Sequence, residues 1–223
     1  MAVVDYGAGN LVSIAQALTA AGAQVVLARR PEGFAGVDAV VVPGVGAAGP
    51  AMARLRRHRL DVPLLAWTAA GRPLLGICLG LQLLFEGSDE DGAATLGVLP
   101  GRTVRLADAP RLPHIGWNQV ERRRAHPLFA GIGQGADFYF VHSFAAAPPP
   151  EADGLVLAET AHGGRFVSAV ARGALAGVQF HPERSGRDGL RLLANFVALA
   201  GAAGAGHTGA GDQAEPGPPM AAG

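Results

Sequence analysis

The 223-residue chain contains no lysine, and all 18 of its basic residues are arginine. A Schiff-base lysine, a pyridoxal-phosphate anchor and a Walker A phosphate site are therefore excluded. The chain has one cysteine, Cys78, so it cannot form an intramolecular disulfide. It also lacks an apolar run long enough to span a bilayer, and no charged segment leads into a hydrophobic stretch near residue 1. We expect a cytoplasmic protein with no membrane partner.

The chain also carries no formal net charge at pH 7, because 18 acidic residues balance the 18 arginines. A neutral chain lacks the electrostatic footprint of a nucleic-acid-binding protein, so we expect no nucleic-acid partner. Two local basic clusters, Arg54–Arg59 and Arg122–Arg124, are explained by a solvated helix face and a loop.

The hydrophobic content, 49%, is enough for one sizeable core, which predicts a single domain over residues 1–200. From Gly201 the chain turns to glycine, alanine and proline with few large apolar groups. We therefore expect residues 201–223 to be a disordered tail.

Short apolar runs alternate with helical patterns in the first half of the chain. Leu11, Ile14 and Leu18 mark one helix face, and a second helix is predicted to start near Pro50. This β-α-β rhythm predicts an α/β fold with a parallel sheet covered on both faces. Strands dominate from about Val98 to Gln179, before a last helix with Leu190, Leu193 and Val197 on one face. The strands that we expect are residues 2–5, 25–27, 39–42, 74–77, 137–144, 155–158, 166–171 and 175–180.

Cys78 interrupts an apolar run, and glycines lie two residues away on each side, at Gly76 and Gly80. This G-x-C-x-G pattern is typical of a nucleophile elbow, a sharp strand-to-helix turn on which close neighbours must be glycine. The following helix N-terminus favours thiolate over thiol. The alternative is a buried core cysteine, which requires neither glycine.

A base for this nucleophile is offered by His181 in the sequence His181-Pro182-Glu183, at the end of an apolar strand. His181 can take the thiol proton and later protonate a leaving group, while Glu183 orients the imidazole. His-Pro-Glu by itself also fits an ordinary surface loop. Because ligands bind beyond the carboxyl ends of strands in open α/β sheets, Cys78, His181 and Pro43-Gly44 are expected to meet there.

The motifs around Cys78 and His181 resemble those of the class I (triad) glutamine amidotransferases. Further segments resemble one group of this family, the glutaminase subunits of imidazole glycerol phosphate synthase. The resemblance extends from the N-terminus to about Ala200, with the motifs in the family's order. It implies a flavodoxin-like three-layer α/β/α fold and hydrolysis of glutamine to glutamate and ammonia, for histidine biosynthesis. The segments that carry it are residues 5–11, 43–46, 76–82, 113–118, 139–143 and 179–183.

The resemblance also implies roles for individual residues. Cys78, His181 and Glu183 would form the catalytic triad. Backbone N–H groups of Val45 or Gly46, with that of Leu79, would form the oxyanion hole. The expected substrate-binding residues are Gly44, Gln82, Glu90, Ser143 and Phe144, and the expected partner interface is formed by Trp117, Tyr139 and Arg184.

The implied partner is a (β/α)₈-barrel cyclase subunit in a heterodimer, and no cofactor or metal is implied. Two positions depart from the family pattern: Ala48 stands where a phenylalanine is usual, and Arg184 where a lysine is usual. The oxyanion donors are backbone groups, so the first change affects local packing and leaves the chemistry intact. Arginine keeps the charge at the second position but changes its geometry.

Three other functions are alternatives to glutamine hydrolysis for histidine biosynthesis. A cysteine peptidase or γ-glutamyl hydrolase would use the same triad on other amides. Triad glutaminases that serve anthranilate, guanylate or pyridoxal-phosphate synthesis share the elbow, but residues 113–118 and 139–143 disfavour them. A dinucleotide-binding site at Gly7-Ala8-Gly9 is disfavoured because the third glycine of G-x-G-x-x-G would fall at Val12.

Overall fold

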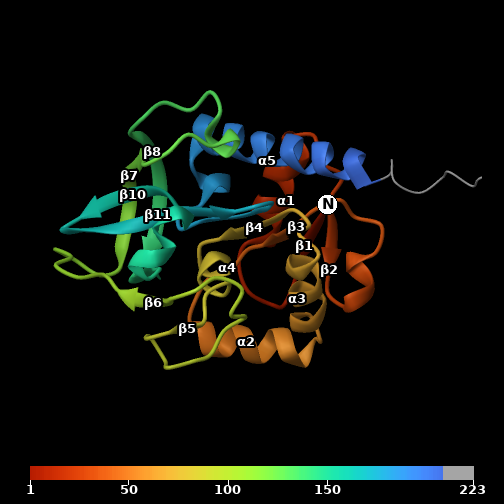
Figure 1. Ribbon diagram of the computed structural model, residues 1–223, viewed down its shortest axis with the longest axis horizontal. Coiled ribbons are helices and arrows are strands. Elements are labelled where there is room, and N and C mark those ends of the chain that lie inside the picture. The colour runs from red at the N-terminus through yellow and green to blue at the C-terminus, as the bar shows by residue number, and fades with distance from the viewer. Residues whose placement is uncertain (208–223) are drawn as a thin grey trace, which may run out of the picture.

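The computed structural model describes residues 1–207, which form a layered α/β structure (Figure 1). Its main sheet has the strand order β2-β1-β3-β4-β12-β11-β10-β7-β8 within these residues. The first five strands in this order pair in parallel, and the last four extend the sheet by antiparallel pairing. The strands are β1 Ala2–Val4, β2 Val26–Ala28, β3 Val40–Val42, β4 Leu74–Ile77, β7 His114–Arg122, β8 Ala136–His142, β10 Val156–His162, β11 Gly164–Arg172 and β12 Leu175–Val178.

The parallel half of the sheet is buried on both faces except at its edge strand β2, where Val26 and Leu27 are exposed. Every residue of β1, β3, β4 and β12 is buried. Successive side chains of a strand point to opposite faces, so Val40 and Val42 join one core cluster and Val41 joins the other. This explains why these strands are continuous apolar runs without alternation.

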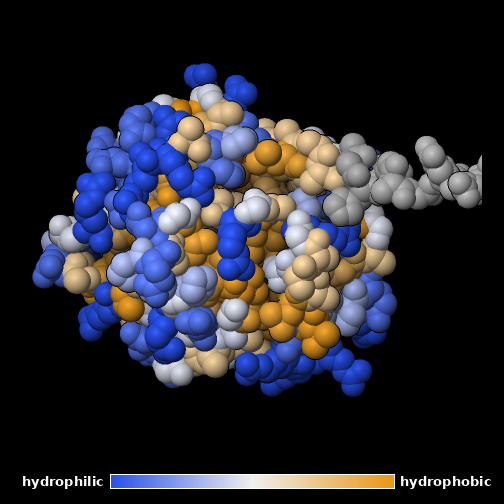
Figure 2. Space-filling view, viewed as in Figure 1, coloured by the Kyte–Doolittle hydropathy of each residue, from blue (hydrophilic) through white to orange (hydrophobic). Residues whose placement is uncertain are grey.

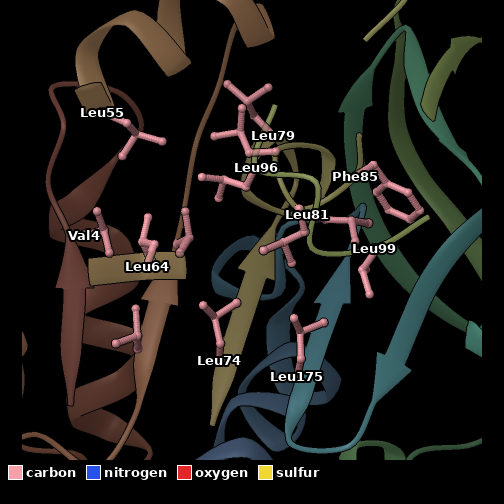
Figure 3. Close-up of a cluster of buried hydrophobic side chains, with 14 of the residues drawn as sticks. Val4, Leu55, Leu64, Leu74, Leu79, Leu81, Phe85, Leu96, Leu99 and Leu175 are labelled. Atoms are coloured by element: carbon pink, nitrogen blue, oxygen red, sulfur yellow. The ribbon is translucent and has the colours of Figure 1, made fainter. Parts of the chain in front are cut away.

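Helices cover the two faces in separate layers. On one face α1 (Leu11–Ala20) packs beside α5 (Gly186–His207), with Ile14 and Leu18 facing the sheet. The other face is covered by α2 (Ala48–Arg57), α3 (Asp61–Ala69) and α4 (Leu79–Gln82), whose leucines meet those of β4 and β12 (Figure 3). The layers are therefore α/β/α, as the sequence predicts.

A smaller sheet, β5-β6-β9, lies beside the main one. Its strands are β5 Gly87–Ser88, β6 Arg102–Arg105 and β9 Phe144–Ala147. Short 3-10 helices complete the connections: η1 Pro31–Phe34, η2 Pro127–Phe129, η3 Pro150–Leu155 and η4 Pro182–Arg184. The turn from β8 into β9 carries Ser143 to the mouth of the site described below.

Helix α5 continues past the boundary expected at Gly201, to His207. Alanine has the highest helix propensity, and Ala202, Ala203 and Ala205 allow the helix to continue where the composition indicated disorder. The rest of the expected tail, residues 208–223, lies outside the described residues.

Two further helical details differ. Leu193 is buried as predicted and Val197 packs against the core, but Leu190 is 43% exposed, and α5 also buries Leu192 and Phe196. Helix α3 was not expected, because its apolar residues are not confined to one face. Hydrophobic side chains consequently reach the surface over this helix (Figure 2), among them Val62 and Leu65. No helix within residues 1–207 is both long and apolar enough to cross a membrane.

Candidate active site

Cys78 occupies a strained turn between β4 and α4, with φ 54° and ψ −112°. A positive φ is costly for a residue with a side chain and is a feature of functional sites. The flanking glycines are required sterically: a Cβ at Gly80 would lie 1.7 Å from the Val42 carbonyl oxygen, and one at Gly76 would lie 2.8 Å from that of Gly80. The predicted nucleophile elbow is therefore present.

The pairing of β4 with β12 brings the second motif to the thiol. Ile77 lies opposite Val178 in the parallel register, and the Cys78 amide donates to the Val178 carbonyl at 2.8 Å. The residues that follow β12, namely Gln179, Phe180 and His181, therefore emerge beside the elbow. Gln179 Nε2 lies 3.6 Å from Cys78 Sγ.

His181 and Glu183 form a buried ion pair, with His181 Nδ1 2.9 Å from Glu183 Oε1 and both side chains 7% exposed. Burial by itself lowers the pKa of His181, but the interactions with Cys78 and Glu183 outweigh it and raise the pKa to about 10. The imidazole is therefore cationic at neutral pH. His181 Nε2, the nitrogen on the side away from Glu183, is buried and, apart from the interaction with Cys78, has no hydrogen-bond partner within the described residues.

Ser185 holds the His-Pro-Glu loop against β8. Its hydroxyl donates to the His181 carbonyl at 2.6 Å and accepts from the Tyr139 amide at 3.0 Å. The His181 amide in turn donates to the Tyr139 carbonyl at 2.8 Å. The position of the imidazole thus depends on β8, which sequence reasoning did not anticipate.

The glycine-rich segment after β3 lies beside the elbow. Leu79 N–H, an expected oxyanion donor, donates to the Gly44 carbonyl at 3.4 Å. The peptide that joins Gly44 to Val45 therefore directs its carbonyl, and not its N–H, toward that donor. Gly46 has φ 92°, and a Cβ at Gly44 would lie 2.2 Å from the Tyr6 hydroxyl, so both positions require glycine.

A cavity of about 260 Å³ opens at the thiol. Among the residues predicted to bind substrate, Gln82, Glu90, Ser143 and Phe144 line it, whereas Gly44 does not. Burial and the neighbouring Asp91 raise the pKa of Glu90. Sequence reasoning did not anticipate four lining residues, which come from loops and strands distant in the sequence: Ala47, Pro113, Val141 and His142.

Gln82 forms one polar wall of this cavity. Its Nε2 donates to the Phe144 carbonyl at 2.8 Å and to Gln179 Oε1 at 3.0 Å. Both N–H bonds of the amide are therefore used, and Oε1 remains as an acceptor.

Two buried histidines support the same wall. A carbonyl oxygen can only accept, so His142 must carry its proton on Nδ1 to reach the Phe144 carbonyl at 2.9 Å. His142 Nε2 then accepts from His114 Nδ1, 3.2 Å away. Burial is the main cause that lowers the pKa of His142 to about 3 and that of His114 to about 4, so both rings are neutral at pH 7.

The three residues expected at a partner interface lie together on the outer side of β7 and β8. Trp117 is 57% exposed and meets the Tyr139 ring edge-on, with centroids 6.2 Å apart. The Arg184 guanidinium lies 4.3 Å from the centroid of the Tyr139 ring. Within residues 1–207 no group of three or more His, Cys, Asp or Glu side chains is arranged to hold a metal ion.

The family model for class-I glutamine amidotransferases matches residues 2–200. The chain belongs to this family. The class-I match makes the chain an enzyme, a glutamine amidotransferase.

Curated relatives narrow the comparison within this family. The chain is 49% identical over 195 residues to an imidazole glycerol phosphate synthase subunit HisH from Symbiobacterium thermophilum, covering 87% of this chain and 91% of that one. The HisH subunit of Chromobacterium violaceum is 46% identical over 211 residues, covering 90% and 98%. That of Synechococcus elongatus is 47% identical over 207 residues, covering 91% and 94%. This glutamine amidotransferase is therefore a member of the HisH family.

Solved structures agree in fold. A crystal structure described as a glutamine amidotransferase superposes on this amidotransferase with a TM-score of 0.70 at 23% identity, covering 90% of this chain and 98% of that one. The PurLQS structure from Thermotoga maritima gives a TM-score of 0.71 at 18% identity, covering 88% and 96%. At these identities the similarity extends to the fold alone, and it confirms the predicted class-I architecture.

Proposed function

We propose that this chain is the glutaminase subunit of imidazole glycerol phosphate synthase: it hydrolyses glutamine and supplies the ammonia to a cyclase subunit in histidine biosynthesis. The observation that carries the proposal is the strained turn at Cys78, which lines a cavity of about 260 Å³ and interacts with His181, the partner of Glu183. The similarity to HisH subunits supports the pathway.

The proposed chemistry starts from a thiolate–imidazolium pair. The sulfur of Cys78 attacks the side-chain amide carbon of glutamine, and the carbonyl oxygen becomes an oxyanion. His181 then protonates the departing nitrogen, which leaves as ammonia, and a γ-glutamyl thioester remains on the sulfur. Water attacks the thioester as His181 takes its proton, and collapse releases glutamate and restores Cys78. Glu183 keeps the imidazole oriented throughout.

Substrate recognition follows from the polar atoms that remain free in the cavity. Gln82 Oε1 is an acceptor suited to the α-ammonium group of glutamine, and the Glu90 carboxylate can serve the same group. Backbone at Ser143 completes this wall. The Phe144 carbonyl acts indirectly, because it already accepts hydrogen bonds from Gln82 and His142.

Oxyanion stabilisation requires a change at residues 44–46. The Gly44 carbonyl accepts the Leu79 N–H at 3.4 Å, so that donor is not free for an oxyanion. Rotation of the Gly44–Val45 peptide would release Leu79 and present the Val45 N–H beside it. We infer that the isolated chain is a slow glutaminase and that the partner favours the rotated peptide.

The partner that we propose is a (β/α)₈-barrel cyclase, which docks on Trp117, Tyr139 and Arg184. These residues flank the loop that carries His181, because Ser185 ties that loop to Tyr139. Cytoplasmic localisation remains part of this proposal, since the pathway's intermediates are small soluble metabolites.

Steady-state glutamate release tests the proposal in three conditions: the chain alone, the chain with the cyclase, and the complex with the cyclase's nucleotide ligand. We expect slow hydrolysis alone and a large increase in the liganded complex. Equal turnover in all three conditions would instead indicate a stand-alone glutaminase. Release from a γ-glutamyl peptide, with none from free glutamine, would indicate a γ-glutamyl hydrolase.

Two variants sharpen this test. Cys78→Ala should abolish glutaminase activity while the complex still uses added ammonia, because that reaction bypasses the thiol. Trp117→Ala should weaken activation by the cyclase, whereas Val62→Ala, which truncates another exposed apolar side chain, on α3, should not. Glutaminase activity in purified Cys78→Ala would rule out the thioester mechanism.

A further inference from the structure

Gln179 is buried, with no exposed surface, and lies two positions before His181. None of the roles assigned above uses it. Its side-chain amide nevertheless faces the reacting atom, with Nε2 3.6 Å from Cys78 Sγ.

The orientation of the Gln179 amide follows from its hydrogen bond with Gln82 and from that of Gln82 with the Phe144 carbonyl. The Phe144 carbonyl can only accept, so the end of Gln82 that lies 2.8 Å from it must be the NH₂ group. The second N–H of that group points at Gln179, 3.0 Å away, which must present its oxygen. The NH₂ group of Gln179 is thereby directed at the sulfur.

We propose that Gln179 is a positioning residue that donates an amide N–H to the Cys78 sulfur, stabilising the thiolate, and that Gln82 and the Phe144 carbonyl hold it in the donating orientation. This rests on the proposed role of Cys78 as the nucleophile. A hydrogen bond to an ionised sulfur is stronger than one to a neutral thiol or a thioester. Gln179 therefore favours the form that attacks glutamine and the form that leaves when the thioester is hydrolysed.

The arrangement also couples the substrate wall to the nucleophile. Gln82 lines the cavity with its oxygen, and its nitrogen orients Gln179. The strand register makes this possible, because β12 places Gln179 directly after the residue paired with Ile77.

Alkylation by iodoacetamide, followed by mass spectrometry across a pH series, tests the proposal in the full-length chain. Cys78 is the sole cysteine, so every adduct reports on it. Gln179→Met keeps the volume without a donor and should raise the pH midpoint of alkylation by about one unit. Gln179→Glu keeps the acceptor for Gln82 but places a negative charge at the sulfur, and it should raise the midpoint further.

Ser168→Ala is the matched control. Ser168 is buried on the neighbouring strand β11, its carbonyl accepts the Gln179 amide, and its hydroxyl has no partner within the described residues. The pH midpoint of Cys78 alkylation in Ser168→Ala should equal that of the wild type. Gln82→Met, which frees the Gln179 amide to turn, should raise the midpoint in the same direction as Gln179→Met and provides a second measurement should that variant misfold.

Kinetics of the complex separate positioning from packing. Gln179→Glu should lower kcat about tenfold with little change in KM, because Gln82 keeps its acceptor. Gln179→Met should also raise KM. Unchanged alkylation midpoints in folded Gln179→Met, Gln179→Glu and Gln82→Met would overturn the inference. That result is distinct from glutaminase activity in Cys78→Ala, which would overturn the proposed function.

Discussion

At the scale of single residues, the site depends on positions where only glycine fits. A Cβ at Gly80 would lie 1.7 Å from the Val42 carbonyl oxygen, which is main chain and cannot move aside as a side chain can. The same close approach fixes the first turn of α4 against β3. The elbow is therefore held by backbone contacts as much as by its own sequence.

Gly80→Ala should destabilise the protein by on the order of 3 kcal/mol or more, because β3 and α4 must separate to admit the methyl group. Gly133→Ala is the control: Gly133 has an ordinary φ and nothing within 4 Å of the added Cβ. We expect its free energy of unfolding to stay within about 0.5 kcal/mol of the wild type. Urea unfolding followed by circular dichroism compares the two, and equal stability of both variants would contradict the steric argument.

At the scale of elements, α5 is tied to the sheet layer by more than apolar contact. Asn195 Nδ2 donates to the Leu128 carbonyl at 3.0 Å and to the Ala130 carbonyl at 2.8 Å. These acceptors belong to η2 and its end, which precede β8. The helix that follows the His-Pro-Glu loop is thereby held against the segment that leads into β8, to which the loop is anchored.

Asn195→Ala should lower the free energy of unfolding by about 1–2 kcal/mol, because two carbonyls lose their donor. Arg187→Ala, which changes an exposed residue on the same helix, should have an effect within about 0.5 kcal/mol. Thermal melts of the purified chains measure both. If the Asn195 variant melts with the wild type, the two hydrogen bonds contribute nothing net to stability.

At the scale of the whole molecule, four histidines have shifted pKa values, and the shifts have opposite signs. Burial is the main cause that lowers the pKa of His114 to about 4 and that of His142 to about 3, and it also lowers the pKa of His126. The pKa of His181 rises to about 10. Neutral His142 lines the cavity at the thiol, whereas the pKa of His181 is raised by its interactions with Cys78 and Glu183.

These shifts predict how stability depends on pH. Below about pH 6.5 the unfolded chain binds protons that folded His114 and His142 do not, so stability should fall as the pH drops toward 4. The contribution of His181 is fully present below its unfolded pKa of 6.5 and is lost as the pH rises through about 10. We therefore expect Tm to decrease on both sides of neutrality.

A titration of Tm in the wild type and in His142→Gln checks the acid limb. Glutamine can still donate to the Phe144 carbonyl but does not titrate, so the fall in Tm between pH 7 and pH 5 should be smaller in the variant. An equally steep fall in both proteins would assign the acid sensitivity to other groups.

The sequence by itself determined the parallel core and the turn at Cys78. Short continuous apolar runs between turn signals are typical of strands buried on both faces, and the steric demands of a nucleophile elbow appear as two glycines around Cys78. The resemblance to a known family added Gln82, Glu90, Ser143 and Phe144, which line the cavity. These signals are local: each depends on a few consecutive residues whose physical requirements are visible in their types.

Only the tertiary structure decided the polar network and the state of the oxyanion segment. Gln179 meets Cys78 across 101 positions of sequence because β12 pairs with β4, and Gln82 meets Phe144 across 62. Which way the Gly44–Val45 peptide turns depends on the Leu79 N–H, which lies on another element. Contacts of this kind follow from strand order and register, and these come from packing the whole chain around one core.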